Sequence, residues 1–565
     1  MRTILRIALA LVSGLAVADT ASAQILWSSP GGSAWLTGTN WTGGTAPTGT
    51  QIAQFGVNPT GTGGVGINMN GTTNNGANNH AVGAIWITNA RTNSHSVGNS
   101  STTSSGTFTL NGATINSVSN TVLFHNGGTT TTPTTLTIQN AVQGGTQTMT
   151  VALANTTNVV QIATGTGATG GTFGNTVAIT SNISGTGSAI TLLGGGDSNN
   201  RGGTLTLGGT NTFSGGIVIG NADGTNAGRV RISSAASLPA TGNITVNANS
   251  QLQLDAIGAT YGASNQTLNL GSMGLASGAN INTGGLRLDA ATGVSTFNPN
   301  IALQSDSGIH VQNTGRTLIA AGVISGSGFG VSKTGAGALV LSGDNAYTGA
   351  TTVSAGSLFV NGNQSTATGA VTVSNTATLG GTGTVGGVVT VQSGGRIIGG
   401  DGMTTGTLNV SNVTVESGGI FAANLAASGT NSTLGLGAQS LDLKSNSIMR
   451  LNAVSGFSAT SAGTYNLATF NNGNSLLLDG LQTSEGDVLG SYVQGSGASG
   501  AVTLNVSSLP TLATGDKLVL RRSGNNLQLV FTPVPEPAFL LAVCGLAVGG
   551  VVGLRKLRRK AVAVG

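Results

Sequence analysis

The chain has 565 residues, of which 6% are charged and 4% are aromatic, while 95 are glycine and only 10 are proline. Short alternating runs of Val, Ile and Leu recur throughout, whereas disordered chains are usually charged and rich in proline. The composition therefore excludes a disordered chain and predicts an all-β protein with many turns. The single cysteine, Cys544, excludes an intrachain disulfide.

The formal net charge of +5 arises at the two ends of the chain. Seven of the 20 basic residues and two of the 15 acidic residues lie in the first 23 residues and from Glu536 onward, which leaves 13 of each between. A formally neutral body lacks the basic surface that binds phosphate backbones. Nucleic acid is therefore not an expected partner.

Residues 1–23 begin with two arginines, continue with an apolar stretch and end in the small residues Ala21, Ser22 and Ala23. This order is typical of a secretory signal peptide. We expect export by the Sec machinery, cleavage by signal peptidase after Ala23, and a mature chain that starts at Gln24.

Residues 24–180 are expected to form an N-terminal cap and the first coils of a β-solenoid. Three of the four tryptophans, Trp27, Trp35 and Trp41, lie near the start of this segment. The end of a solenoid exposes apolar core and strand edges, so large rings are expected to cover it. Alternatively, Trp35 and Trp41 offer ring faces for stacking on sugars and are candidate glycan contacts.

Two segments share one motif, since residues 204–215 read TLTLGGTNTFSG and residues 338–349 read ALVLSGDNAYTG. The leucines are expected on the inward face of a strand and the glycine in a turn of positive φ. The asparagine is expected to bond turn backbone groups, and the aromatic residue to return to the core. The matched positions are Leu205, Leu207, Gly209, Asn211, Phe213 and Gly215, and Leu339, Leu341, Gly343, Asn345, Tyr347 and Gly349.

Residues 181–430 are expected to form the main solenoid, with coils of about 20 residues. Apolar alternation is bracketed there by Gly, Asn and Ser, and Val373, Val391 and Val410 follow one another at 18 and 19 residues in similar contexts. A thin parallel stack needs only Val, Ile, Leu and Ala inside, and stacked Asn and Thr are expected to form ladders between coils. We therefore predict a parallel β-helix.

Residues 324–360 resemble the autotransporter-associated β-strand repeat. The resemblance implies a right-handed parallel β-helix at a bacterial surface. The earlier copy departs from the family, because RGGTLTL replaces KTGAGALVL and Phe213 replaces the tyrosine. No counterpart of the autotransporter membrane barrel is found in the sequence, so self-translocation is not expected.

The sequence contains no catalytic or metal-binding pattern, and no cofactor is expected. The four histidines lack metal-ligand spacing and are expected at the surface or in loops. The carboxylates are scattered, and Arg287 and Asp289 share one strand face as an expected surface pair. A polysaccharide-cleaving β-helix enzyme remains an alternative if a distant carboxylate pair converges in the fold.

Residues 431–530 are expected to form a small C-terminal β region, and residues 531–560 a sorting signal. The apolar run from Ala538 to Leu554 has the minimum length for a transmembrane helix. A basic membrane stop follows at Arg555, Lys556, Arg558, Arg559 and Lys560.

The order of Pro535, Glu536 and Pro537, apolar helix and basic end resembles the PEP-CTERM sorting domain. The resemblance implies transient anchoring in the inner membrane of a Gram-negative bacterium and processing by exosortase. The sequence thus predicts a non-enzymatic structural protein of the cell surface or extracellular matrix, with extracellular polysaccharide as a candidate partner. A carbohydrate-binding adhesin is the main alternative.

Overall fold

The computed structural model divides the chain into two compact units. Unit 1 comprises residues 1–358 and 362–369, and unit 2 comprises residues 359–361 and 370–565. The structure describes residues 23–27, 35, 40–55, 65–68, 80–87, 95–99, 105–115, 118–125, 135–141, 149–162, 175–194, 203–275, 283–289, 292–427, 430–472 and 475–534. The predicted domain borders at residues 180, 430 and 530 stay predictions.

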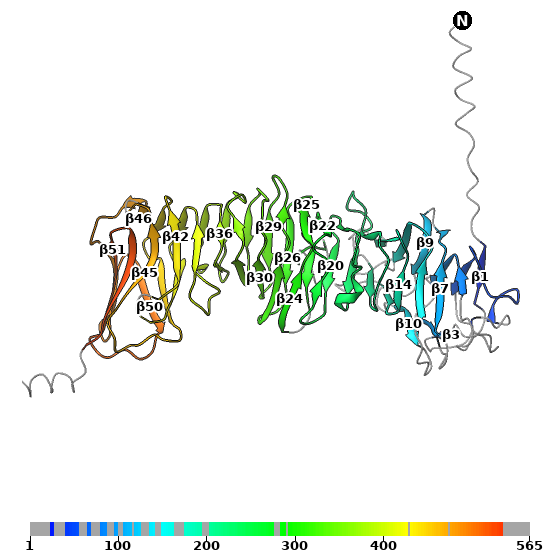
Figure 1. The fold of residues 1–565 in the computed structure, drawn as a ribbon, viewed down its shortest axis with the longest axis horizontal. Helices are drawn as coiled ribbons and strands as arrows, with labels where there is room; N and C mark the ends of the chain where they lie inside the picture. Colours follow the sequence, from blue (N-terminus) through cyan, green and yellow to red (C-terminus); the bar gives the residue numbers. More distant parts are fainter. Residues whose placement is uncertain are drawn as a thin grey trace, which may run out of the picture. The chain divides into compact units, whose positions relative to one another are not determined.

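The chain of unit 1 winds in successive coils, and we call each coil a rung. Each strand of one rung pairs in parallel with the equivalent strand of the next rung (Figure 1). The first sheet contains β1 (Gln24–Leu26), β2 (Ile52–Phe55), β5 (Ala84–Ile87), β9 (Val118–His125), β12 (Thr157–Ile162), β15 (Ala189–Gly194), β17 (Gly216–Ile219), β19 (Ile244–Val246), β22 (Thr267–Leu270), β25 (Asn300–Leu303) and β28 (Ile324–Ser325). A short strand, β8 (Ala113–Ile115), pairs with β9 in the antiparallel sense.

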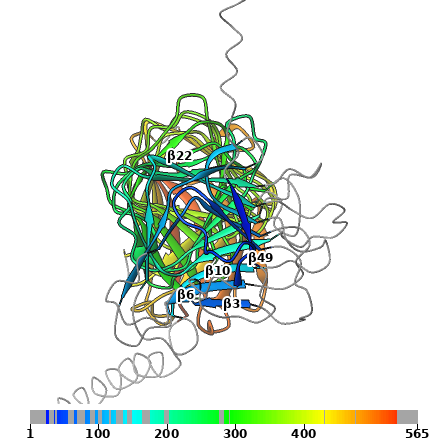
Figure 2. The ribbon, with the colours of Figure 1, turned by 90° about the vertical axis from the view of Figure 1, so that its right-hand side faces the viewer.

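The second sheet of unit 1 is another parallel ladder, formed by other strands of the same rungs. Its strands are β3 (Val65–Asn68), β6 (His95–Asn99), β10 (Thr135–Ala141), β13 (Thr176–Ile179), β16 (Thr204–Leu207), β18 (Arg229–Ile232), β20 (Gln251–Leu254), β23 (Leu286–Leu288), β26 (Ser307–Val311), β29 (Val331–Thr334) and β31 (Thr351–Val353). Figure 2 shows β3, β6 and β10 one behind another, with β22 of the first sheet on the opposite side of the stack.

A third set of strands completes the rungs of unit 1. The early rungs use β4 (His80–Val82), β7 (Gly106–Leu110), β11 (Met149–Leu153) and β14 (Asn182–Ser184). The later rungs use β21 (Thr260–Tyr261), β24 (Gly293–Phe297), β27 (Arg316–Ala320) and β30 (Ala338–Leu341). A 3-10 turn, η2, spans Ala235–Ser237, and β32 (Ser357–Val360) and β33 (Asn363–Gln364) lie at the unit border.

Unit 2 continues the same design and ends in antiparallel strands. Its first parallel ladder contains β34 (Val371–Val373), β37 (Val389–Val391), β40 (Val413–Val415), β43 (Leu441–Leu443) and β46 (Leu476–Leu478). The second contains β35 (Thr378–Gly381), β38 (Arg396–Ile398), β41 (Ile420–Leu425), β44 (Ile448–Ala453) and β50 (Thr503–Ser508). The third contains β36 (Thr384–Val385), β39 (Thr407–Val410), β42 (Thr433–Gly437) and β45 (Gly463–Phe470). The antiparallel strands are β47 (Leu481–Gln482), β48 (Val488–Val493), β49 (Gly497–Gly500), β51 (Lys517–Ser523) and β52 (Asn526–Thr532).

The core of each unit follows from strand alternation, because successive side chains point to opposite faces of a strand. In the second sheet, Leu205, Val230, Leu252, Leu286 and Ile309 occupy one register column and are all fully buried. Aliphatic residues therefore fill this column of the interior. The all-β class is confirmed, and the parallel ladders agree with the expected β-helix.

The predicted coil spacing is right at one step and wrong at the next. Val373 pairs with Val391, as expected from their 18-residue separation. Val391 pairs with Val415, whereas Val410 lies in β39 and pairs with Val385. The reason is a turn between β38 and β39, which lengthens the coil. In this turn the Asp401 carboxylate accepts hydrogen bonds from the backbone N–H groups of Met403 and Thr404.

Stacked amides bond between rungs, as expected from the sequence. In unit 2, Asn452 Nδ2 donates to Asn424 Oδ1 over 3.0 Å, and the two residues are register partners. In unit 1, Asn269 Nδ2 donates to Thr245 Oγ1 over 3.3 Å, again between register partners. These hydrogen bonds connect adjacent rungs through their side chains.

Over the part of the chain that the structure describes, no helix is long and apolar enough to cross a membrane. The predicted transmembrane run from Ala538 to Leu554 lies outside the described residues.

Candidate functional site

The shared motif forms the same clamp in both of its copies, and we call residues 209–215 and 343–349 the repeat clamps. In the first copy, Asn211 Oδ1 accepts the Ile183 N–H over 2.9 Å, and the Thr212 N–H donates to the Ile183 carbonyl over 2.7 Å. Ser214 Oγ accepts the Gly187 N–H over 2.7 Å. The clamp therefore replaces a strand by side-chain and backbone bonds to the preceding rung.

The second clamp repeats these bonds at equivalent positions. Asn345 Oδ1 accepts the Ile324 N–H over 2.7 Å, and the Ala346 N–H donates to the Ile324 carbonyl over 2.8 Å. Thr348 Oγ1 accepts the Gly328 N–H over 2.7 Å. The predicted asparagine role is thus refined, because the amide bonds the neighbouring rung rather than its own turn.

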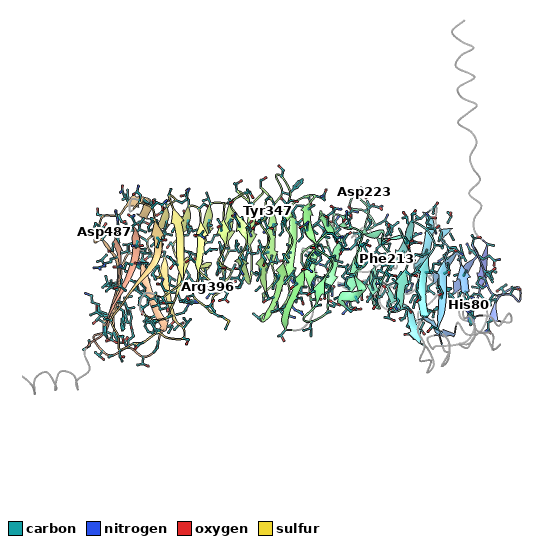
Figure 3. All side chains as sticks on the ribbon, viewed as in Figure 1. His80, Phe213, Asp223, Tyr347, Arg396 and Asp487 are labelled. Carbon is teal, nitrogen blue, oxygen red and sulfur yellow. The ribbon has the colours of Figure 1, made fainter. Side chains whose placement is uncertain are left out.

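The aromatic residue of each clamp is buried, as expected, and Figure 3 labels both Phe213 and Tyr347 within unit 1. The Tyr347 hydroxyl bonds to Thr351 Oγ1 over 2.7 Å. Phe213 has no hydroxyl, and Ile217 stands four residues on, where the second copy has Thr351. The second clamp therefore pairs two hydroxyl groups where the sequence of the first has two apolar residues.

We expect Tyr347→Phe to lower the free energy of unfolding by about 1–2 kcal/mol, because the buried Thr351 hydroxyl loses its partner. The double variant Tyr347→Phe with Thr351→Ile copies the first clamp and should recover most of the loss. Urea unfolding of the three proteins measures both effects. An equally unstable double variant would show that the two positions are not coupled.

The clamp glycines are required mainly by close backbone approach. Gly209 has φ +67°, as predicted for the turn, but Gly343 lies outside the left-handed region, so positive φ is not the shared reason. A Cβ at Gly343 would lie 2.4 Å from the Gly322 carbonyl oxygen, and one at Gly209 would lie 2.7 Å from the Ser181 carbonyl oxygen. Both sites exclude a side chain because the backbone of the preceding rung occupies that space.

Lys333 is a charged residue at a core position of unit 1. It pairs with Ile309 and Val353 in the inward column of the second sheet and is fully buried. Its Nζ donates to the carbonyls of Thr334, Gly335 and Ala355 over 2.9, 2.9 and 3.1 Å. Burial lowers the pKa of Lys333 to about 7.

This lowered pKa predicts that unit 1 becomes more stable between pH 7 and pH 10. In that window the unfolded lysine binds a proton and the folded one does not, so the free energy of unfolding rises with pH. The gain is on the order of 4 kcal/mol at most, since three carbonyl oxygens favour the charged form. Urea unfolding at several pH values measures it, with Lys333→Met as the control. Equal pH slopes for both proteins would contradict the prediction.

The N-terminal tryptophans form a packed cluster at the start of unit 1. The ring centroids of Trp27 and Trp41 are 4.8 Å apart, and those of Trp35 and Trp41 are 4.9 Å apart. Trp35 also packs against Phe108 at 5.6 Å, and Trp41 against Phe55 at 5.7 Å.

Trp41 Nε1 donates to the Trp35 carbonyl over 2.7 Å, and both side chains are at most 2% exposed. This placement agrees with a capping role. It leaves neither Trp35 nor Trp41 with an exposed ring face on which a sugar could stack.

A charged cluster lies on the second sheet, where the sequence shows only scattered carboxylates. Arg231 pairs with Asp255, and Arg287 Nη2 pairs with Asp289 Oδ1 at 2.9 Å. Gln253 Nε2 bridges the two carboxylates over 2.8 and 3.0 Å. The predicted Arg287–Asp289 pair is present, but Arg287 is buried rather than at the surface. Register pairing of β20 with β23 brings the two carboxylates together.

The prediction that the histidines lie at the surface or in loops is wrong for His125 and His310. All four lie in strands, and His125 and His310 are buried. His310 contacts Thr334 and Gln312 through its two ring nitrogens over 2.9 and 2.6 Å. Burial is the main cause that lowers the pKa of His310. Among the described residues, no group of His, Cys, Asp and Glu could hold a metal ion.

The predicted processing sites are only partly covered by the structure. Ala23 and Gln24 are described, and β1 begins at Gln24. The other residues predicted for processing lie outside the described residues, namely Ala21, Pro535, Glu536, Pro537, Arg555, Lys556, Arg558, Arg559 and Lys560.

Two segments of the chain match the passenger-associated-transport-repeat family. The matched residues are 202–225 and 331–360, and they contain both repeat clamps. This match confirms the resemblance to autotransporter repeats. A stretch of 84 residues, 15% of the chain, is 48% identical to the adhesin BmaC autotransporter of Brucella suis biovar 1 (strain 1330). It spans 2% of the length of that relative, so the likeness concerns one segment.

Proposed function

We propose that this chain is an exported, non-enzymatic structural protein of the surface or extracellular matrix of a Gram-negative bacterium, built as a right-handed parallel β-helix. The two repeat clamps carry the proposal. Each clamp bonds its rung to the preceding one, and the family that both clamps match is named for transported passengers. Shape rather than catalysis is then what the chain supplies.

Adhesion is the form of interaction that the similar protein suggests, because that relative is named an adhesin. The tryptophan cluster is buried, so the contact surface for extracellular polysaccharide or another cell is the outward face of the rungs. Thr206, Thr245 and Asn269 lie on that face, and many weak hydrogen bonds along a stack add up through multivalency.

Surface labelling tests the proposal directly. An epitope tag inserted beside the exposed Asp223 turn should be detected by antibody on intact cells of the source bacterium. Deletion of the gene should reduce cell attachment or matrix content, and the tagged full chain should restore it. A tag that antibody reaches only in lysed cells, or an unchanged deletion strain, would overturn the proposal.

The enzymatic alternative rests on Asp255 and Asp289, because retaining glycosidases need two carboxylates close together. Both are already bonded to arginine and to Gln253, which suits a structural role. The variant Asp255→Asn with Asp289→Asn should therefore support attachment as well as the unchanged protein, provided that it folds. Polysaccharide cleavage by the unchanged protein that this variant lacks would favour the enzyme.

Sorting is proposed to follow the tail signal, with signal peptidase acting at the start of the chain and exosortase near Pro535, Glu536 and Pro537. The order of motif, apolar run and basic end supports it. Replacing the three motif residues by alanine should leave the tail uncut and the protein at the inner membrane. Intact mass of the natural protein reads both cleavage points, and a full-length tail on released protein would contradict the proposal.

A further inference from the structure

Arg316 is a buried cation at the start of β27 in unit 1. It alternates with Leu318 and Ala320, and all three residues point into the core, with Arg316 only 1% exposed. Its register partner on the preceding rung is Gly293. The side chain therefore lies inside the stack rather than on its surface.

The Arg316 guanidinium has no hydrogen-bond partner among the described residues. Its Nε, Nη1 and Nη2 atoms are all buried and unbonded. Lys333, in β29 of the second sheet, shows how this unit otherwise treats a buried cation, since three carbonyls accept hydrogen bonds from its Nζ. A guanidinium keeps its charge even when burial lowers its pKa, so an unpartnered Arg316 is costly.

The acidic groups whose charges act on Arg316 are already engaged, and the first of them, the Tyr261 hydroxyl, bonds to the backbone of Ala256. Asp255 and Asp289 lie close enough to influence Arg316, but each is paired with another arginine and shares the Gln253 amide. Neither forms an ion pair with Arg316 in the described part of the chain. Four guanidinium groups, those of Arg229, Arg231, Arg287 and Arg316, therefore share the influence of two carboxylates, and neither carboxylate is bonded to Arg316.

We propose that Arg316 binds a small monovalent inorganic anion inside unit 1, for which chloride is the probe. The nearly complete burial of Arg316 excludes a polysaccharide carboxylate or another bulky anion. A buried anion would accept the guanidinium N–H bonds and balance its charge. Because the unfolded chain lacks this enclosed site, anion binding stabilises the fold by mass action. This inference does not depend on the proposed surface function.

Thermal unfolding tests the site in the full mature chain. Melting temperature is measured as chloride replaces gluconate at constant ionic strength. The unchanged protein should show a saturating rise with chloride, and Arg316→Met should show none. Arg521→Met removes an exposed arginine of unit 2, leaves both aspartate pairs intact and should keep the chloride response. Equal responses of the unchanged protein and Arg316→Met would overturn the proposal.

Bromide diffraction decides the question without a variant. Crystals grown in sodium bromide should show an anomalous peak within hydrogen-bond distance of the Arg316 guanidinium. Water in its place, or a side chain turned toward a protein acceptor, would refute the site even if Arg316→Met does not fold.

Discussion

Gly349→Ala is expected to lower the free energy of unfolding by about 3 kcal/mol or more, because the substitution forces two rungs apart. A Cβ at this position would lie 2.2 Å from the Phe329 carbonyl carbon and 2.4 Å from the Gly330 nitrogen. These are backbone atoms and cannot rotate away. Urea unfolding followed by circular dichroism measures the loss.

Gly328→Ala is the matched control for this substitution. Gly328 has φ +83°, but a Cβ there would meet nothing within 4 Å. Its variant should lose only about 1–2 kcal/mol from backbone strain. Similar losses at both positions would show that rung contact is not the reason for the clamp glycine.

Trp41→Ala is expected to cost about 3–5 kcal/mol, as for other large buried rings. The variant removes contacts with Trp27, Trp35 and Phe55 and the hydrogen bond to the Trp35 carbonyl. Hydrogen exchange should show the loss first in β1 and β2, since those strands lie beside the cluster.

Trp41→Phe separates packing from the indole bond. It keeps an aromatic ring and should lose less than Trp41→Ala, chiefly through the unpaired Trp35 carbonyl. If Trp41→Ala instead keeps full stability and loses glycan binding, the ring serves recognition and the capping interpretation is wrong.

The fold class was readable from the sequence because its signal is local. Alternation of small aliphatic residues specifies which side of a strand faces inward, and the Gly-Asn-aromatic spacing of residues 209–215 and 343–349 specifies the clamps. Coil length was less readable, since a turn such as that at Asp401 adds residues without changing the strand pattern on either side.

The polar groups of the interior were missed for a different reason. Gln253 bridges two aspartates that are 34 residues apart in the chain, so only the register of β20 and β23 brings them together. Lys333 carried a signal that was not used, because it follows Val331 at the spacing of an inward face. Arg316 begins its strand after a turn, where alternation gives no warning.

The unequal coils have an engineering consequence. Val373 to Val391 takes 18 residues and Val391 to Val415 takes 24, yet both steps join the same kind of strand pair. Corners can thus absorb foreign peptide while the rungs keep their register. Cargo attached at the exposed Met403 of the turn at Asp401 would be displayed at a fixed position along unit 2.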